Sequence, residues 1–201
     1  MGTKKARTEK VGTTEEAKQE AIAIETEVKK CKKCPLFENR KNAVPGEGSL
    51  NARIMLVGEA PGRNEDALGK PFVGAAGRFL NELLEHAGMN RDEIYITNIV
   101  KCRPPENRKP LPGETAACMP YLSRQIALIK PGIICILGAT ALDAILGENE
   151  ISEMHGKGIE RSGVVYFPLY HPAAGIYNRR LRAAMLDDIK NVGKALEMKS
   201  G

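Results

Sequence analysis

Four cysteines have the spacing of a metal site. Cys31 and Cys34 form a C-x2-C pair, and Cys102 and Cys118 follow much later, with fifteen residues between them. A C-x2-C pair with two distant cysteines suits a four-thiolate site for zinc or for an iron–sulfur cluster. The basic N-terminal residues are not followed by the apolar core of an export signal, so we expect reduced thiols that bind metal rather than disulfides. Such a site would tie the N-terminal segment to the middle of the chain.

The fifth cysteine and two of the three histidines lack a pattern of this kind. Cys135 lies within the apolar segment GIICI, residues 132–136, where a small buried residue is expected. His86 falls on an expected helix and His155 in an expected loop, and no motif surrounds either one. We therefore expect both histidines at the surface.

Polar or glycine-rich groups follow four apolar runs, at residues 58–62 (GEAPG), 97–98 (TN), 138–140 (GAT) and 171–172 (HP). If these runs are parallel strands, the groups meet at the edge of the sheet where α/β proteins bind ligands. GEAPG lacks the lysine and hydroxyl residue of a phosphate loop. Its glycines would let the backbone approach a ligand closely, and the alternative is a tight turn with a solvated Glu59.

The glycine-rich turn, Asn98 and His171 could converge on a pocket at this edge, and Phe72 lies in the loop after the glycine-rich turn. Phe72, in the segment KPFVG, is either a core residue or a stacking platform. Asn98 lies in the apolar run ITNIV, and a buried amide must find hydrogen-bond partners. It is either a structural amide satisfied by the backbone or a side chain that reads a base edge with one donor and one acceptor. His171 precedes a proline after the last apolar run, and it is either a structural histidine or a functional one.

Basic residues are concentrated in two segments. The loop KCRPPENRKP, residues 101–110, adjoins the third cysteine, and Arg179, Arg180 and Arg182 follow the histidine segment. The chain has a net charge of +5 and a pI near 8.9. These features are compatible with a polyanionic partner, and solvated loops are the alternative.

The remaining pattern alternates apolar runs with amphipathic segments. The first helix should open at the capping box Thr13-Thr14-Glu15-Glu16 and run to about Lys30. The expected strands are Arg53–Gly58, Ile94–Val100, Ile133–Leu137 and Val164–Leu169. The expected helices after the first are Ala75–Ala87, Glu114–Ile129, Ala139–Leu146 and Asn178–Met198.

This alternation predicts an α/β fold, a three-layer α/β/α sandwich with a central, mainly parallel four-stranded sheet. Residues 1–12 are expected to be a disordered basic tail, and 13–201 a single domain with an N-terminal helix and a cysteine-bearing segment. The longest apolar stretch, Ile133–Leu146, is interrupted by polar residues and glycine, so no membrane span is expected.

Together these motifs resemble the family 4 uracil-DNA glycosylases, the iron–sulfur branch of the uracil-DNA glycosylase superfamily. The resemblance runs from about Cys31 to the last helix and rests on C-x2-C, GEAPG, KPFVGAAG, TNIVKCRPP, a fourth cysteine and HPAA, in that order. Family 5 has alanine where this chain has Gly62. Many relatives have serine after the proline of the histidine motif, where this chain has Ala173.

The resemblance implies a role for each matching residue. Cys31, Cys34, Cys102 and Cys118 would ligate a [4Fe–4S] cluster. Glu59 would position or polarise the attacking water near the sugar, and Gly58 of the same turn would help bind the substrate. Phe72 would stack on the flipped uracil.

Two further roles concern the polar edge of the base. Asn98 would read uracil O4 and N3–H, and His171 would donate to O2 as negative charge develops. Glu65 would lie near uracil C5 and help to exclude thymine. Ile176 and Tyr177 are candidates to fill the gap left by the flipped base.

The implied function is hydrolysis of the N-glycosidic bond of uracil in single- or double-stranded DNA, without a lyase step. We expect a monomeric, cytoplasmic DNA-repair enzyme. One alternative is a glycosylase of broader base specificity. The other is a non-catalytic iron–sulfur module that binds nucleic acid, against which the presence of Glu59, Asn98 and His171 argues.

Overall fold

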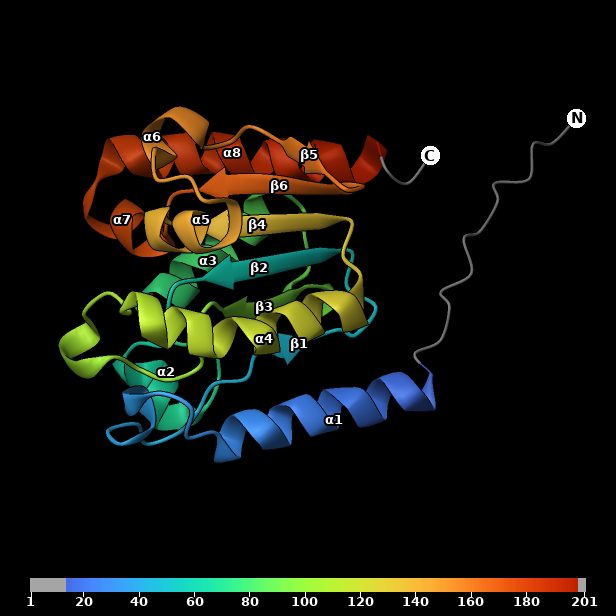
Figure 1. Cartoon of the computed structure of the whole chain (residues 1–201). Helices are drawn as coiled ribbons and strands as arrows, with labels where there is room; N and C mark the ends of the chain where they lie inside the picture. The colour runs from blue at the N-terminus through green and yellow to red at the C-terminus, as the bar shows by residue number, and fades with distance from the viewer. Residues whose placement is uncertain (1–13, 199–201) are drawn as a thin grey trace, which may run out of the picture.

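Four parallel strands form the centre of one six-stranded sheet (Figure 1). In the computed structural model, which describes residues 14–198, the sheet order is β1-β3-β2-β4-β6-β5. The central strands are β2 (Ile54–Gly58), β3 (Tyr95–Asn98), β4 (Ile133–Leu137) and β6 (Val164–Leu169). All four strands expected from the sequence are therefore confirmed, with small shifts at their ends.

The prediction of a four-stranded sheet was wrong, because a short antiparallel strand lies at each edge. β1 (Glu47–Gly48) pairs with β3, and β5 (Ile159–Arg161) pairs with β6. Segments of two and three largely polar residues carry no apolar periodicity, so no pattern in the sequence predicts these two strands. The tail predicted at residues 1–12 lies outside the described residues.

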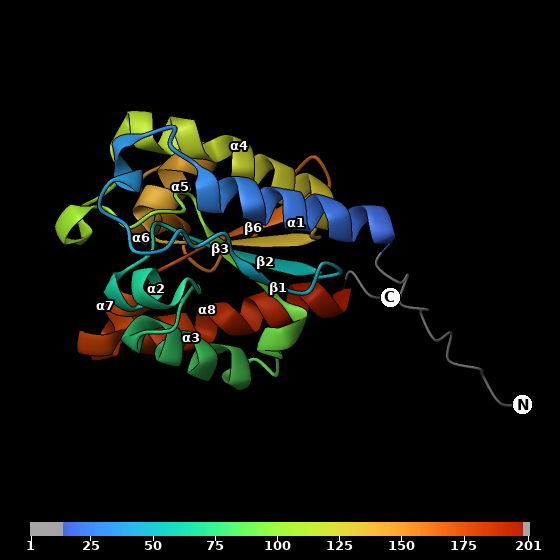
Figure 2. The ribbon, with the colours of Figure 1, turned by 90° about the horizontal axis from the view of Figure 1, so that it is seen from below.

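Helices cover both faces of the sheet (Figure 2). One face carries α1 (Glu15–Lys30), α4 (Pro112–Ile129) and α5 (Ala139–Leu146), and the other carries α3 (Ala75–His86) and α8 (Arg179–Met198). Short helices are α2 (Arg63–Leu68), α6 (Ile151–Met154) and α7 (Pro172–Tyr177). Three 3-10 turns are at Pro35–Phe37, Arg91–Glu93 and Pro105–Asn107.

The central strands are buried on both sides. In β2, Met55 and Val57 belong to the hydrophobic cluster beneath α1 and α4, whereas Ile54 and Leu56 belong to the cluster beneath α3 and α8. Successive side chains of a strand point to opposite faces, so a continuous apolar run is what a doubly covered strand requires.

The N-terminal helix is fixed to α4 by both apolar and ionic contacts. The Thr14 hydroxyl accepts a hydrogen bond from the Ala17 amide and caps α1, as the capping pattern predicts. Val28 is buried in the cluster beneath α4, and Arg124 of α4 forms ion pairs with Glu20 and Glu27 of α1. This packing holds the C-x2-C pair, which follows α1, beside the helix that contains Cys118.

The loops after the parallel strands gather at one edge of the sheet. This edge is on the left of Figure 1, where α2 and α7 also lie. It is the edge at which α/β sheets bind ligands, and it contains the polar motifs found in the sequence. None of the helices in residues 14–198 combines the length and the apolar character that a membrane crossing needs.

Candidate active site and cysteine centre

Gly58, Asn98 and Phe72 meet at the carboxyl end of β2. Gly58 and Asn98 are register partners on the neighbouring strands β2 and β3. A Cβ atom placed on Gly58 would lie 2.4 Å from Asn98 Oδ1 and 2.9 Å from Phe72 Cζ. Only glycine leaves room for both side chains, so the first residue of GEAPG shapes the site through its missing side chain.

The side-chain oxygen of Asn98 is buried and has no partner. Asn98 is 2% exposed, and its Oδ1 is the one fully buried side-chain polar atom in residues 14–198 without a hydrogen bond. A buried acceptor left unpaired destabilises the protein by roughly 1–3 kcal/mol. The interpretation of Asn98 as a structural amide satisfied by the backbone therefore fails for this oxygen, and a ligand that donates a hydrogen bond would satisfy it.

Phe72 belongs both to the core and to this site. It is 7% exposed and packs in the cluster beneath α3, which agrees with the core interpretation. Its ring also faces His171, with ring centroids 5.7 Å apart and planes inclined by 31°. The backbone of Phe72 has a φ of +51°, in the left-handed region that bulky residues rarely adopt.

His171 is held as a neutral donor. Its Nδ1 accepts a hydrogen bond from the Ala173 amide (3.2 Å) at the start of α7, so the ring proton belongs on Nε2. Burial lowers the pKa of His171 from 6.5 to about 4, and the nearby Glu65 carboxylate opposes this only in part. At neutral pH the imidazole is therefore uncharged, with an Nε2–H group available to a ligand.

Glu59 follows β2 and has a side chain without a partner. The Glu59 carbonyl accepts a hydrogen bond from the Val100 amide (3.2 Å), which continues the pairing of the two chains beyond β2 and β3. The side chain is half-buried and makes no hydrogen bond or ion pair with any residue from 14 to 198. A fixed backbone with an unengaged carboxylate leaves this group free to act on a bound substrate or water.

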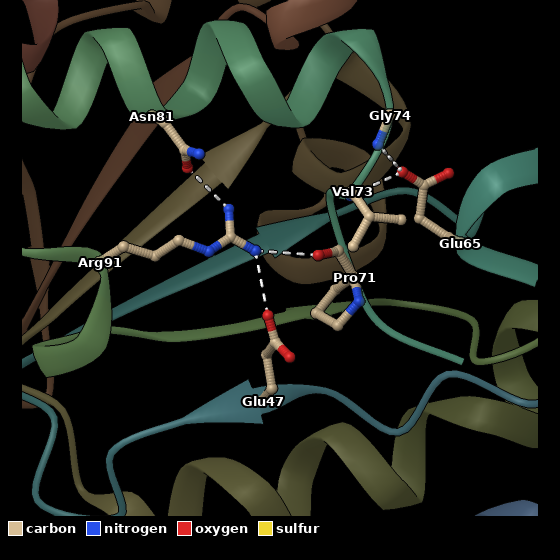
Figure 3. A network of polar contacts seen from close by, with 7 residues as sticks. All are labelled: Glu47, Glu65, Pro71, Val73, Gly74, Asn81 and Arg91. Carbon is tan, nitrogen blue, oxygen red and sulfur yellow. Dashed lines mark hydrogen bonds and ion pairs between the residues drawn. The ribbon is translucent and has the colours of Figure 1, made fainter. Parts of the chain in front are cut away.

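Glu65 links two loops of the site. Its Oε2 accepts from the Gly62 amide (3.1 Å), and its Oε1 accepts from the amides of Val73 and Gly74 (both 2.9 Å). Figure 3 shows the two bonds that Oε1 accepts from Val73 and Gly74. The carboxylate thus joins the GEAPG loop to the loop that contains Phe72.

The four predicted ligand cysteines line one cavity between α1, α4 and the loop after β3. Cys102 and Cys118 are buried, whereas Cys31 and Cys34 are half-buried. No three Cys, His, Asp or Glu side chains among the described residues converge closely enough to hold a single metal ion. The sulfur atoms therefore surround a common space without meeting at a point.

Hydrogen-bond donors point at three of these sulfur atoms. Arg40 Nη1 donates to Cys102 Sγ (2.9 Å), the Lys101 amide to Cys118 Sγ (3.3 Å) and the Lys33 amide to Cys31 Sγ (3.5 Å). Burial raises the pKa of the Cys118 thiol to about 11 and also raises that of Cys102. Buried thiolates need positive partners, and a donor set of this kind suits metal-bound sulfur.

Lys101 does not lie at the protein surface, where both interpretations of the basic loop at residues 101–110 would place it. It is 1% exposed, and its Nζ donates to Asn98 O (2.7 Å), Gln125 Oε1 (2.7 Å) and Thr97 Oγ1 (2.6 Å). Burial lowers the pKa of Lys101 to about 7. The position of Lys101 directly after an apolar run was the feature of the sequence that could have indicated its burial.

The three remaining predictions concern His155, His86 and Cys135. His155 was predicted at the surface but is partly buried, with Nδ1 2.7 Å from Asp188 Oδ2 and its ring 4.6 Å from that of Tyr170. The pairing joins segments 33 residues apart, so no local pattern could reveal it. His86 is exposed and Cys135 is fully buried, as predicted.

Part of the predicted basic surface is already engaged in ion pairs. Arg108 forms two hydrogen bonds with the Glu114 carboxylate (2.9 and 2.7 Å), and Arg182 pairs with Glu82. Arg179 and Arg180 are exposed, and neither side chain has an ion-pair partner in the described part of the chain. These two arginines remain available for a polyanion at the edge of the sheet that contains the site.

Comparison of the sequence with known families identifies the class of protein to which this fold and candidate site belong. A family model described as "Uracil DNA glycosylase superfamily" matches residues 45–192. The chain is 49% identical to the type-4 uracil-DNA glycosylase of Sulfurisphaera tokodaii, over 84% of this chain and 81% of that protein. It is 46% identical to the type-4 uracil-DNA glycosylase of Thermotoga maritima, over 86% of this chain and 93% of that protein.

A third type-4 uracil-DNA glycosylase, from Saccharolobus solfataricus, is 47% identical over 88% of this chain and 86% of that protein. The chain therefore belongs to the type-4 uracil-DNA glycosylases, a family of DNA-repair enzymes. The family resemblance expected from the sequence motifs is confirmed.

Proposed function

We propose that this enzyme flips uracil out of DNA and hydrolyses its N-glycosidic bond by attack of water, leaving an abasic site. The observation that carries this proposal is the unpartnered, buried Oδ1 of Asn98. It lies close to Gly58 and Phe72, whose ring contacts His171, at the edge of the sheet where α/β proteins bind ligands. A flipped base is a flat ligand with polar atoms along one edge, which is what such a site accommodates.

Recognition of the base is assigned to Asn98 and Phe72. Uracil presents a donor at N3–H and an acceptor at O4. The Asn98 amide can accept from the first with the oxygen that now lacks a partner, and donate to the second. The Phe72 ring restores the stacking that the base loses when it leaves the duplex.

The reaction is assigned to Glu59 and His171. Cleavage produces a positively charged sugar and a negatively charged uracil. Glu59, whose side chain is unengaged, stabilises the sugar and positions the attacking water. The neutral His171 donates Nε2–H to O2 as negative charge develops there.

Glu65 contributes to this site by holding its walls. Its three bonds to backbone amides fix the GEAPG loop against the Phe72 loop. We assign to it the family role as well, a carboxylate near uracil C5 that disfavours the methyl group of thymine. Gly58 completes the pocket, since any side chain there would overlap Asn98.

The four cysteines Cys31, Cys34, Cys102 and Cys118 would hold a [4Fe–4S] cluster. Each thiolate of such a cluster binds a different iron atom, so sulfur atoms that surround a cavity suit it better than sulfur atoms that converge on one ion. The bound cluster supplies a cross-link between the segment after α1, the loop after β3 and α4. Its assigned role is structural.

The proposed partner is uracil-containing DNA, bound by a monomer in the cytoplasm. Arg179 and Arg180 lie just after α7, which begins beside His171. Tyr177 at the end of α7 is 92% exposed, whereas Ile176 packs against the core. Tyr177 is therefore our candidate to fill the gap that the flipped base leaves in the duplex.

Release of free uracil tests this function. Enzyme purified without oxygen should release uracil from a single- or double-stranded oligonucleotide and leave an alkali-labile abasic site. The same oligonucleotide with thymine in place of uracil is the control. Glu59→Gln keeps the size of the side chain but removes its charge, and should slow excision by about 10²-fold or more. Tight binding of the uracil oligonucleotide without release of uracil would favour the non-catalytic module instead.

The lowered pKa of His171 predicts a particular pH dependence. Because burial lowers this pKa to about 4, the imidazole stays neutral from pH 8 down to about pH 5. His171→Gln replaces it with a donor that does not titrate in this range, and should slow excision at every pH. The ratio of wild-type to His171→Gln single-turnover rates should therefore stay constant between pH 5 and pH 8. A ratio that changes with a midpoint near pH 6.5 would contradict the neutral donor.

A further inference from the structure

The backbone of Phe72 is held in a conformation that phenylalanine rarely adopts. Its φ of +51° lies in the left-handed region, where the Cβ atom crowds the following carbonyl. The residue is also pressed against α3, since a Cβ on Gly77 would lie 1.8 Å from Phe72 O. Strained conformations of this kind persist only where the surroundings enforce them, and they are concentrated at functional sites.

Arg91 holds the chain on one side of Phe72. Its Nη2 donates to the carbonyl of Pro71 (2.9 Å), the peptide group that precedes Phe72. The same guanidinium donates to Asn81 Oδ1 on α3 (2.9 Å) and to Glu47 Oε1 on β1 (3.1 Å). Figure 3 shows the guanidinium between these three acceptors. Two anchors on separate elements thus fix the group that holds Pro71.

Glu65 holds the chain on the other side. Its Oε1 accepts from the amides of Val73 and Gly74, the two residues that follow Phe72 (both 2.9 Å). A cation therefore binds the carbonyl before Phe72, and an anion binds the amides after it. Hydrogen bonds with one charged partner are stronger than neutral ones, and here they fix both peptide groups on which the φ and ψ of Phe72 depend.

We propose that Arg91 is a positioning residue for base excision, which together with Glu65 clamps the backbone around Phe72 so that its ring stays at the uracil-binding position. The inference rests on the proposed function, in which Phe72 stacks on the flipped base. Arg91 itself lies outside the sequence motifs of the site and acts only through Phe72. Without it, the Pro71 peptide is free to rotate, and Phe72 can relax to a negative φ that moves its ring.

A double-mutant cycle between Arg91 and Phe72 tests the clamp. Arg91→Met removes the guanidinium but keeps the length of the side chain, and should slow single-turnover excision by about tenfold or more. In a Phe72→Ala background, the same substitution should have almost no further effect, because the ring that it positions is gone. A role in general stability would instead give the same loss in both backgrounds.

Two further variants serve as controls. Arg53→Met removes another arginine that bonds a carbonyl oxygen, that of Leu196 (3.0 Å), and it should leave the excision rate unchanged. Arg91→Lys can still donate to Pro71 O but cannot span all three acceptors, so it should recover part of the lost rate. Thermal unfolding and iron content are measured for each variant, and if Arg91→Met does not fold, Arg91→Lys takes its place in the cycle.

The outcomes separate this inference from the function on which it rests. Suppose that Phe72→Ala greatly lowers the excision rate. If Arg91→Met then has no effect on the rate, or has the same effect in the wild-type and Phe72→Ala backgrounds, the clamp is overturned and the proposed function stays intact. A Phe72→Ala variant that excises uracil at the wild-type rate would remove the stacking role, and the clamp with it. An Arg91 effect that disappears in the Phe72→Ala background supports both.

Discussion

Replacing Asn98 with aspartate should slow uracil excision by about a hundredfold or more. The carboxylate keeps the shape of the amide but replaces its donor with an oxygen that repels uracil O4. A lost hydrogen bond and a new repulsive contact in a buried site each disfavour binding by about 1–3 kcal/mol. Single-turnover rates on an oligonucleotide with one uracil measure the change.

The same substitution should reduce the difference between the excision rates of uracil and cytosine. Cytosine presents a donor at N4 and an acceptor at N3, the reverse of uracil, so the wild-type amide meets it with donor facing donor. A carboxylate can accept from N4. Asn98→Ala is the matched control, because it removes both hydrogen bonds without favouring cytosine. If the Asn98→Asp variant excised uracil at the wild-type rate and unfolded at the wild-type temperature, another residue would have to read the base.

Replacing Cys118 with alanine should destabilise the protein far more than replacing Cys135. Cys118 is 8% exposed and Cys135 is 0% exposed, so the two thiols differ little in burial. They differ in surroundings, because Cys118 lines the cavity shared with the other three cysteines and Cys135 lies within β4. A lost cluster ligand should lower the free energy of unfolding by more than about 4 kcal/mol, and a lost core thiol by about 1 kcal/mol.

Iron, sulfide and zinc analysis of protein purified without oxygen provides the second measurement. Wild type and Cys135→Ala should contain about four iron atoms per chain, the number in the proposed cluster, and Cys118→Ala should contain much less. Equal unfolding temperatures for the two variants would contradict the assignment of Cys118 as a ligand. A colourless wild type with one zinc per chain would replace the cluster with a zinc site.

Pairing across the sheet explains which residues of the candidate site could be predicted from the sequence to lie together. Gly58, Asn98 and His171 each end or follow an apolar run, and parallel strands bring such positions to one edge. Arg91 and Lys101 follow no such rule. Arg91 contacts residues 10, 20 and 44 positions away, and Lys101 looks like part of a basic loop until its burial is known.

The sequence by itself determined the four central strands, the five longest helices and the family. These follow from local signals, namely apolar periodicity, caps and ordered motifs, which do not depend on distant contacts. Only the tertiary structure decided the edge strands, the burial of Lys101, the unpartnered oxygen of Asn98 and the backbone strain at Phe72. Each of these depends on groups that are far apart along the chain and that packing brings within hydrogen-bond distance.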